Sequence, residues 1–217
     1  MKQNKNAFSD EERHAVYRVI KERRDMRHFL PDPIDKAVFE RILMAGHHAP
    51  SVGLMQPWRI IRITDPSIKQ AIKQIVDKER IKTAEQLADR QHEFMKLKIE
   101  GISQCGELVV MVLMDQREKH IFGRRTMPEM DLASVSCAIE NMWLAARAEG
   151  IGMGWVSFFE PSDLGNILAL PQGAQAVAIL CLGHVEAFYS APLLALEEWR
   201  KGCSLSDVLF ENSWPYK

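Results

Sequence analysis

The sequence has few cysteines, and their spacing argues against the structures that cysteines usually build. The four cysteines lie far apart and form no CxxC pair: Cys105, Cys137, Cys181 and Cys203. We therefore expect neither a disulfide framework nor a zinc site, and we predict reduced thiols that are mostly buried. The adjacent His47 and His48 point in different directions and make poor joint ligands, so no metal site is predicted.

Net charge and long apolar runs are also lacking. The formal charge is only -1, which gives no indication of a nucleic-acid partner. The longest apolar run, Leu108 to Met114, is far too short to span a bilayer, so no membrane association is predicted. Residues 1–13 are polar and predict no signal peptide, which leaves a cytoplasmic location as the default expectation.

The common nucleotide and nucleophile motifs are missing as well. There is no P-loop and no GxSxG string. The GIGMG string at residues 150–154 follows a predicted helix and precedes a predicted strand, the reverse of a dinucleotide-binding turn. The chain shows no repeat and no Pro/Gly/Ser-rich linker, so its 217 residues predict one domain, 1–217.

Apolar periodicity predicts an α+β protein. The first predicted helix is 11–24, with Ser9 and Asp10 as its cap and with Pro31 and Pro33 ending the unit. A second helix is predicted from residue 34, one or two within 67–100, another over 131–149, and a short one from residue 161. The predicted strands are 59–64, 108–114, 155–159 and 176–183. This order is typical of helices covering a central sheet.

Two segments leave their role open. Residues 67–100 are highly charged and have helical apolar spacing. A solvated helical face is slightly favoured over a mobile cover above a site. The tail 189–217 has little periodicity and is suited to wrapping a neighbouring subunit.

A basic cluster follows the first predicted helix. Arg23, Arg24 and Arg27 lie close together, and helical spacing would place Arg23 and Arg27 on one face. Their mutual repulsion is relieved by an anion, and guanidinium groups suit a phosphate monoester. For the cluster alone, a solvated basic surface is the simpler interpretation. We expect the positive charges to lower the pKa of Asp25, which is either a salt-bridge partner or an acid/base group beside a ligand.

Two more segments present polar groups. The loop 49–58, APSVGLMQPW, offers the Ser51 hydroxyl and the Gln56 amide, which both donates and accepts as a heterocyclic imide requires. In GMGWVSFF, residues 152–159, glycines permit close contact with a flat ring, and Ser157 is the single hydroxyl of an apolar predicted strand. An ordinary loop and a buried serine bonded to backbone are the structural alternatives.

In their order along the chain, these segments resemble the nitroreductase-like FMN flavoproteins. The strings are RRDMR, SVGLMQPW, and the helix DLASVSCAIENMWLAARAEG followed by IGMGWVS. Within that superfamily they are most similar to the 5,6-dimethylbenzimidazole synthases, from about Ala15 to Asp207. Many nitroreductases carry Asn where Met55 stands, which disfavours an ordinary nitroreductase.

The resemblance implies an α+β fold with a central, mostly antiparallel sheet flanked by helices, in an intertwined homodimer with two FMN sites at its interface. It implies an FMN-binding set near the phosphate and the flavin: Arg23, Arg24, Arg27, Ser51, Gln56 and, less directly, Arg200. It also implies that Asp25 and Ser157 are the catalytic residues near the reactive part of the ring.

The implied reaction consumes the flavin. Reduced FMN reacts with dioxygen, without a metal, and is cut into 5,6-dimethylbenzimidazole, the lower ligand of cobalamin, and erythrose 4-phosphate. Asp25 is implied to steer protons and Ser157 to position the oxygenated flavin. Residues 67–100 would form a helical lid that excludes water, and a separate NAD(P)H-dependent flavin reductase would supply reduced FMN.

Two other functions stay open from the sequence. A conventional FMN-dependent nitroreductase or quinone reductase would share the fold and most flavin contacts, and would leave the flavin intact after many turnovers. A flavin-binding or storage protein would bind FMN without turnover. The presence of both Asp25 and Ser157 favours the synthase, on the strength of the resemblance.

Overall fold

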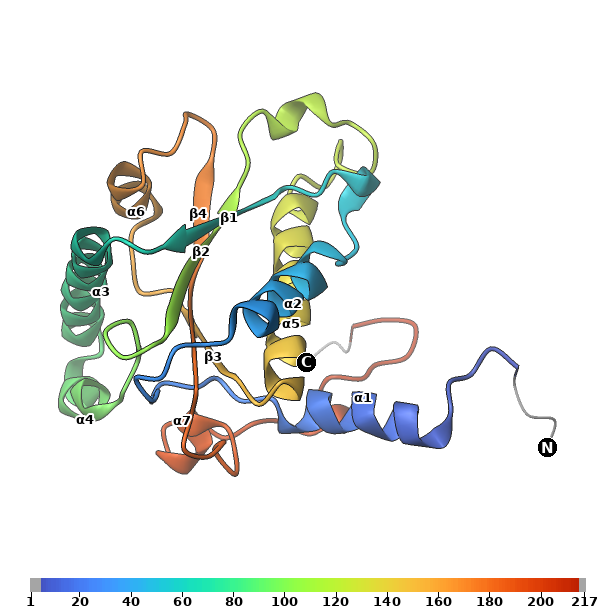
Figure 1. Cartoon of the computed structure of the whole chain (residues 1–217), viewed down its shortest axis with the longest axis horizontal. Coiled ribbons are helices and arrows are strands. Elements are labelled where there is room, and N and C mark those ends of the chain that lie inside the picture. Colours follow the sequence, from blue (N-terminus) through green and yellow to red (C-terminus); the bar gives the residue numbers. More distant parts are fainter. Residues whose placement is uncertain (1–4, 215–217) are drawn as a thin grey trace.

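A four-stranded antiparallel sheet lies at the centre of the computed structural model, which describes residues 5–214 (Figure 1). The strands are β1 (Trp58–Ile63), β2 (Glu107–Leu113), β3 (Gly152–Val156) and β4 (Gln175–Gly183), in the spatial order β1-β2-β4-β3. The helices are α1 (Asp10–Glu22), α2 (Lys36–His47), α3 (Pro66–Gln86), α4 (Gln91–Lys96), α5 (Met130–Ala148), α6 (Pro161–Ile167) and α7 (Leu193–Leu196). Short 3-10 turns are η1 (Val52–Leu54), η2 (Ala88–Arg90), η3 (Arg117–Lys119) and η4 (Leu205–Asp207).

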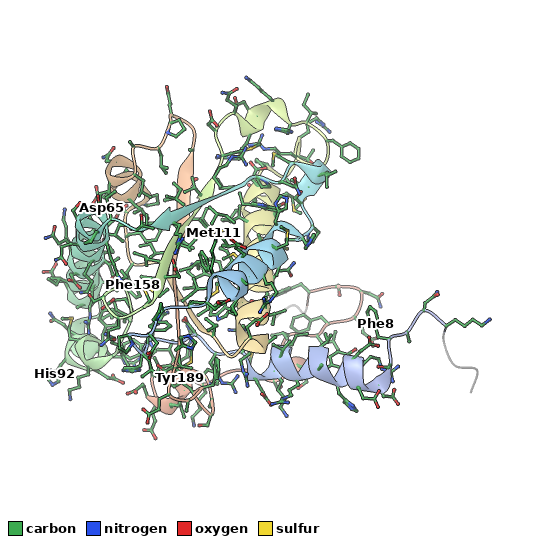
Figure 2. The ribbon with its side chains drawn as sticks, viewed as in Figure 1. Phe8, Asp65, His92, Met111, Phe158 and Tyr189 are labelled. Carbon is green, nitrogen blue, oxygen red and sulfur yellow. The ribbon has the colours of Figure 1, made fainter. Side chains whose placement is uncertain are left out.

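Helices cover both faces of the sheet and make a three-layer core. Side chains alternate between the faces of a strand, so Val109 and Met111 of β2 face the layer of α2 and α5. Leu108 and Val110 face the layer of α3 and α6. Figure 2 shows Met111 among the side chains at the centre of the molecule. Because both faces are covered, β2 is a continuous apolar run.

The predicted α+β class and the predicted order of elements are confirmed. The predicted capping is confirmed too, because the Ser9 hydroxyl accepts from the Glu12 N–H while the Glu12 carboxylate accepts from the Ser9 N–H. Two boundaries are wrong. Helix α1 ends at Glu22, and β3 runs over residues 152–156 rather than 155–159. The glycines at 152 and 154 concealed the start of β3, since glycine is unfavourable in strands.

The charged segment 67–100 divides into two parts. In α3, Ile72 and Val76 are fully buried against the sheet, so this helix belongs to the body of the fold. The shorter α4 lies beyond it, and Phe94 packs in a small cluster with Leu97 and Ile99. The two parts together match the prediction of one or two helices.

Apolar side chains remain exposed on α1 and on the tail. Helix α1 buries no residue and leaves Tyr17 68% exposed, and Figure 1 shows it extending away from the sheet. In the tail, Leu205 and Trp214 are more than 70% exposed, and residues 215–217 of the predicted wrapping segment lie outside the described residues. A chain that leaves this much apolar surface uncovered has surface available for a partner.

The prediction for the cysteines is half wrong. Cys105 and Cys181 are buried, but Cys137 on α5 and Cys203 in the tail are exposed. All four are free thiols. Cysteine is a residue type that is usually buried. The exposure of Cys137 and Cys203 depends on where the fold places them, which residue type does not indicate.

Candidate functional site

The segment after α1 is extended and lies along the free edge of β3. The Met26 N–H donates to the Met153 carbonyl at 3.0 Å, and Asp25 forms a parallel bridge with Met153. The expectation that Arg23 and Arg27 share a helical face is therefore wrong. In an extended chain alternate side chains share a side, so Arg23, Asp25 and Arg27 still project together.

Gly154 allows this close pairing. A Cβ atom there would collide with the Met26 carbonyl oxygen and would lie 3.0 Å from Arg27 Nη1. We expected the glycines of this string to permit contact with a flat ring. In the structure the close neighbour of Gly154 is instead the protein's own backbone, because residues 25–27 occupy the sheet edge at that point.

Asp25 is held by two donors of different charge. Its Oδ2 lies 2.5 Å from Arg27 Nη2, and its Oδ1 accepts from the Trp155 N–H at 3.0 Å. Burial raises the pKa of the Asp25 carboxyl above its usual value, outweighing the positive charges of Arg27 and Arg23 and the Trp155 hydrogen bond. The sequence-based expectation of a lowered pKa is wrong, because it counted the nearby charges without the loss of water.

Arg27 and Arg24 have buried donors that the protein does not use. Arg27 is 8% exposed, and its Nη2 also donates to the Trp155 carbonyl at 2.8 Å. Arg24 donates only to backbone carbonyls, among them that of Ser190 at 3.1 Å. Among the described residues, Arg27 Nη1 and Arg24 Nε are buried without a hydrogen-bond partner. Buried donors without partners are unusual, and both belong to arginines that line the same cavity.

Arg23 already has protein partners. Its Nε lies 3.6 Å from a Glu140 carboxylate oxygen on α5, and its guanidinium carbon lies 4.6 Å from the centre of the Trp143 ring. The Trp143 indole N–H donates to the carbonyls of Arg24 and Met153. This tryptophan therefore fixes the basic segment to α5.

These groups line a cavity of about 360 Å³. That volume is within the range of small-molecule sites. Its charged lining residues are Arg23, Arg24, Asp25, Arg27 and Lys98. Its apolar wall includes Phe94, Leu97, Phe158, Leu193, Leu194 and Trp199. Figure 2 shows Phe158 on the inner side of α3 and α4, and its ring centre lies 5.9 Å from that of Phe94. A cationic lining beside aromatic walls suits a flat ligand that bears an anionic group.

The predicted residues of the 49–58 loop are not in this cavity. The Ser51 hydroxyl accepts from the Gln56 N–H at 3.0 Å, and the Val52 N–H donates to Ser134 at the start of α5. Arg23 contacts α5 at Trp143, nine residues further along, which corresponds to roughly 14 Å of helix. A single chain therefore does not bring Ser51 and Gln56 together with the arginines.

Ser157 and Arg200 also lie outside the cavity lining. Ser157 follows the end of β3 and is exposed, so neither the strand position nor the buried backbone-bonded alternative is correct. Arg200 is exposed, although its neighbour Trp199 lines the cavity. The roles of Ser157 and Arg200 were implied by the resemblance. In the single chain, their neighbours Phe158 and Trp199 line the cavity.

The structure adds lining residues that the sequence did not single out. Lys98, Phe94, Phe158 and Trp199 come from three segments far apart in the chain. The only local signal was the apolar pair Phe94 and Leu97 in a charged stretch. Within residues 5–214, no group of three His, Cys, Asp or Glu side chains is placed to hold a metal, and no helix is long and apolar enough to cross a membrane.

Known proteins share much of this sequence and its fold. The model of the nitroreductase family matches residues 20–184. The chain is 37% identical over 196 residues to a 5,6-dimethylbenzimidazole synthase of Rhodobacter capsulatus, covering 89% of this chain and 95% of that protein. It is 39% identical over 183 residues to a protein of the same name from Rhodospirillum rubrum, covering 82% and 85%. Among solved structures, oxidized iodotyrosine deiodinase bound to FMN and 3-iodo-L-tyrosine has a TM-score of 0.71 at 16% identity, covering 92% of this chain and 100% of that one.

Proposed function

The chain belongs to the nitroreductase family, and from this premise we propose that it is a 5,6-dimethylbenzimidazole synthase that fragments reduced FMN with dioxygen. The high identity to proteins of that name, over most of both chains, supports this activity over a conventional nitroreductase and over a storage protein. The products are 5,6-dimethylbenzimidazole and erythrose 4-phosphate. The single structural observation that carries the proposal is Asp25, fixed inside a cationic and aromatic cavity.

The cavity residues fit FMN. Arg24 and Arg27 line the cavity and carry several N–H donors each, and a phosphate or a flavin carbonyl has oxygens to accept from such donors. Phe94 and Phe158 supply an apolar aromatic wall, with their ring planes tilted by 46° to each other. Bound reduced FMN supplies an electron-rich ring that reacts with dioxygen. The protein residues then bind, orient and exchange protons.

We assign proton transfer to the Asp25 carboxyl. Its raised pKa brings it nearer to the range in which it both takes up and releases a proton. Of its two oxygens, Oδ2 faces the Arg27 guanidinium, whereas Oδ1 faces the neutral Trp155 N–H. A proton is therefore better accommodated on Oδ1. Ser157 lies outside the cavity lining of the single chain, beside Phe158, which lines it, and we assign it the positioning of the oxygen-bearing part of the ligand once FMN is bound.

A second copy of the chain completes the site in this proposal. Ser51 and Gln56 lie away from the arginines of their own chain, and a homodimer would present them to the partner's cavity. The exposed apolar side chains of α1 and the tail, such as Tyr17 and Trp214, support such an interface. If the purified chain sediments as a monomer with FMN bound, the proposed dimeric site is contradicted.

The lid is assigned to residues 88–100 rather than to the whole segment 67–100. Helix α3 packs on the sheet, while α4 and the residues after it line the cavity. The Arg90 guanidinium lies 3.5 Å from the centre of the Trp199 ring and joins this cover to the C-terminal segment. A closed cover leaves little room for NAD(P)H, so a separate reductase would supply reduced FMN.

The test is an aerobic reaction with chemically reduced FMN, followed by mass spectrometry for 5,6-dimethylbenzimidazole. We expect product in proportion to enzyme, and much less with Asp25→Asn or Ser157→Ala while FMN binding persists. Asp32→Asn, at an exposed aspartate away from the cavity, is the matched control. Intact FMN as the sole recovered flavin, together with NAD(P)H oxidation in the presence of a nitroaromatic, would support the nitroreductase instead.

A further inference from the structure

The cavity contains more positive charge than its own carboxylate balances. Four basic side chains line it, Arg23, Arg24, Arg27 and Lys98, against one acidic side chain, Asp25. Arg27 is paired with Asp25 at 2.5 Å, and Arg23 lies near Glu140 outside the cavity. The other two basic side chains of the cavity are Arg24 and Lys98.

Among the described residues, neither remaining charge donates a hydrogen bond to a carboxylate. Arg24 donates only to neutral carbonyls. Lys98 Nζ lies 3.8 Å from a Glu100 oxygen, but the same oxygen lies 3.7 Å from Lys73 Nζ. Lys73 is also paired with Asp77 at 2.5 Å, so Glu100 is mainly the counter-charge of Lys98, but at 3.8 Å the Lys98–Glu100 contact is longer than a hydrogen bond.

Glu100, the carboxylate near Lys98, is itself held in place. It is 7% exposed and accepts from the Ile102 N–H at 2.6 Å. On either side of Lys98, Leu97 and Ile99 are buried in the cluster around Phe94. The lysine side chain is one-third exposed and lines the cavity.

We infer that Lys98 is a further ligand-binding residue, which contacts an anionic group of the flavin nucleotide from the lid side of the cavity. This inference rests on the proposed function, because the ligand is taken to be FMN. A phosphate monoester carries close to two negative charges at neutral pH, which matches Arg24 and Lys98 together. The ring of reduced flavin is a second anionic group within the same ligand.

The placement links binding to the closing of the lid. Arg24 belongs to the segment between α1 and α2, whereas Lys98 belongs to the segment that follows α4. An anion that contacts both would hold residues 88–100 against the body of the protein. Lys98 therefore contributes to affinity and to covering the ligand at once.

The experiment measures FMN affinity by flavin fluorescence for the full-length chain and its variants. We expect Lys98→Met to weaken FMN binding about tenfold, equivalent to about 1.4 kcal/mol, and to reduce the salt dependence of binding. Methionine keeps the apolar stem, so the wall stays packed. Lys98→Arg should bind within about threefold of the native chain, since it keeps the charge. The matched control is Lys96→Met, an exposed lysine on α4 that does not line the cavity.

Riboflavin, which lacks the phosphate, separates a contact with the phosphate from a contact with the ring. A loss for FMN with none for riboflavin identifies the phosphate as the contact, and equal losses for both identify the ring carbonyls, which accept from a lysine in oxidised flavin as well. FMN affinity in Lys98→Met equal to that of Lys96→Met would overturn the inference, provided that the native chain binds FMN. Failure of the native chain to bind FMN would instead overturn the proposed function.

Discussion

Replacing Gly154 with Ala should displace the segment that carries Asp25. The new Cβ would overlap the Met26 carbonyl oxygen, and backbone on both sides prevents an easy adjustment. Overpacking of this kind costs about 1–3 kcal/mol. The displaced chain would also weaken three hydrogen bonds, from Met26 N–H to Met153, from Trp155 N–H to Asp25, and from Arg27 to Trp155.

The expected net loss is about 3–5 kcal/mol in the free energy of unfolding. Each weakened hydrogen bond adds about 1 kcal/mol, more where a charge takes part, and the lower backbone entropy of alanine offsets about 0.5–1 kcal/mol. FMN affinity should fall as well, because Asp25 and Arg27 move together.

Urea unfolding of the variant measures this loss, with Gly165→Ala on α6 as the control. The nearest atom to a Cβ at Gly165 is a Leu170 methyl at 3.9 Å, an ordinary contact, so this variant should be unchanged or up to about 1 kcal/mol more stable. Gly154→Ala with a stability within about 0.5 kcal/mol of that control would refute the close approach at β3.

Three further perturbations test other parts of the structure. The raised pKa of Asp25 means that the folded state holds the Asp25 proton to higher pH than the unfolded state does. The native chain should therefore lose stability relative to Asp25→Asn as the pH rises from about 4 through that pKa. Free energies of unfolding that stay parallel for the two proteins across this pH range would contradict the raised pKa. Asp131→Ala should cost about 3 kcal/mol in urea unfolding, because the buried carboxylate pairs with two arginines, and a loss below about 1 kcal/mol would show that the pairs contribute little. Arg90→Ala should speed amide exchange in residues 88–100 about two- to fivefold by removing the contact with Trp199, and unchanged exchange would argue against a latch there.

Local patterns were sufficient for much of the fold. Apolar spacing gave α5 to within one residue at each end, and the Ser9 cap marked the start of α1. The run at 108–114 gave β2 with a shift of one residue. These features depend on neighbours within a few residues, and the physics that produces them acts at that range.

Boundaries failed where distant contacts decide the conformation. The basic string after Glu22 has good helix formers, yet it is extended because it pairs with the edge of β3. Strand β3 begins at Gly152, a residue that disfavours strands, because β4 and residues 25–27 both need close approach to that backbone. Tertiary contacts override propensity at both positions.

For the site, the sequence by itself determined the kinds of residue: a basic cluster with one aspartate, and a resemblance that suggested the ligand. The tertiary structure decided which of them meet. It placed Lys98, Phe158 and Trp199 beside Asp25, and left Ser51 and Gln56 at another part of the chain. It also reversed the expected shift in the pKa of Asp25, since desolvation depends on atoms 130 residues away along the chain. Burial and cavity walls are set by such long-range contacts, which have no signature in local spacing.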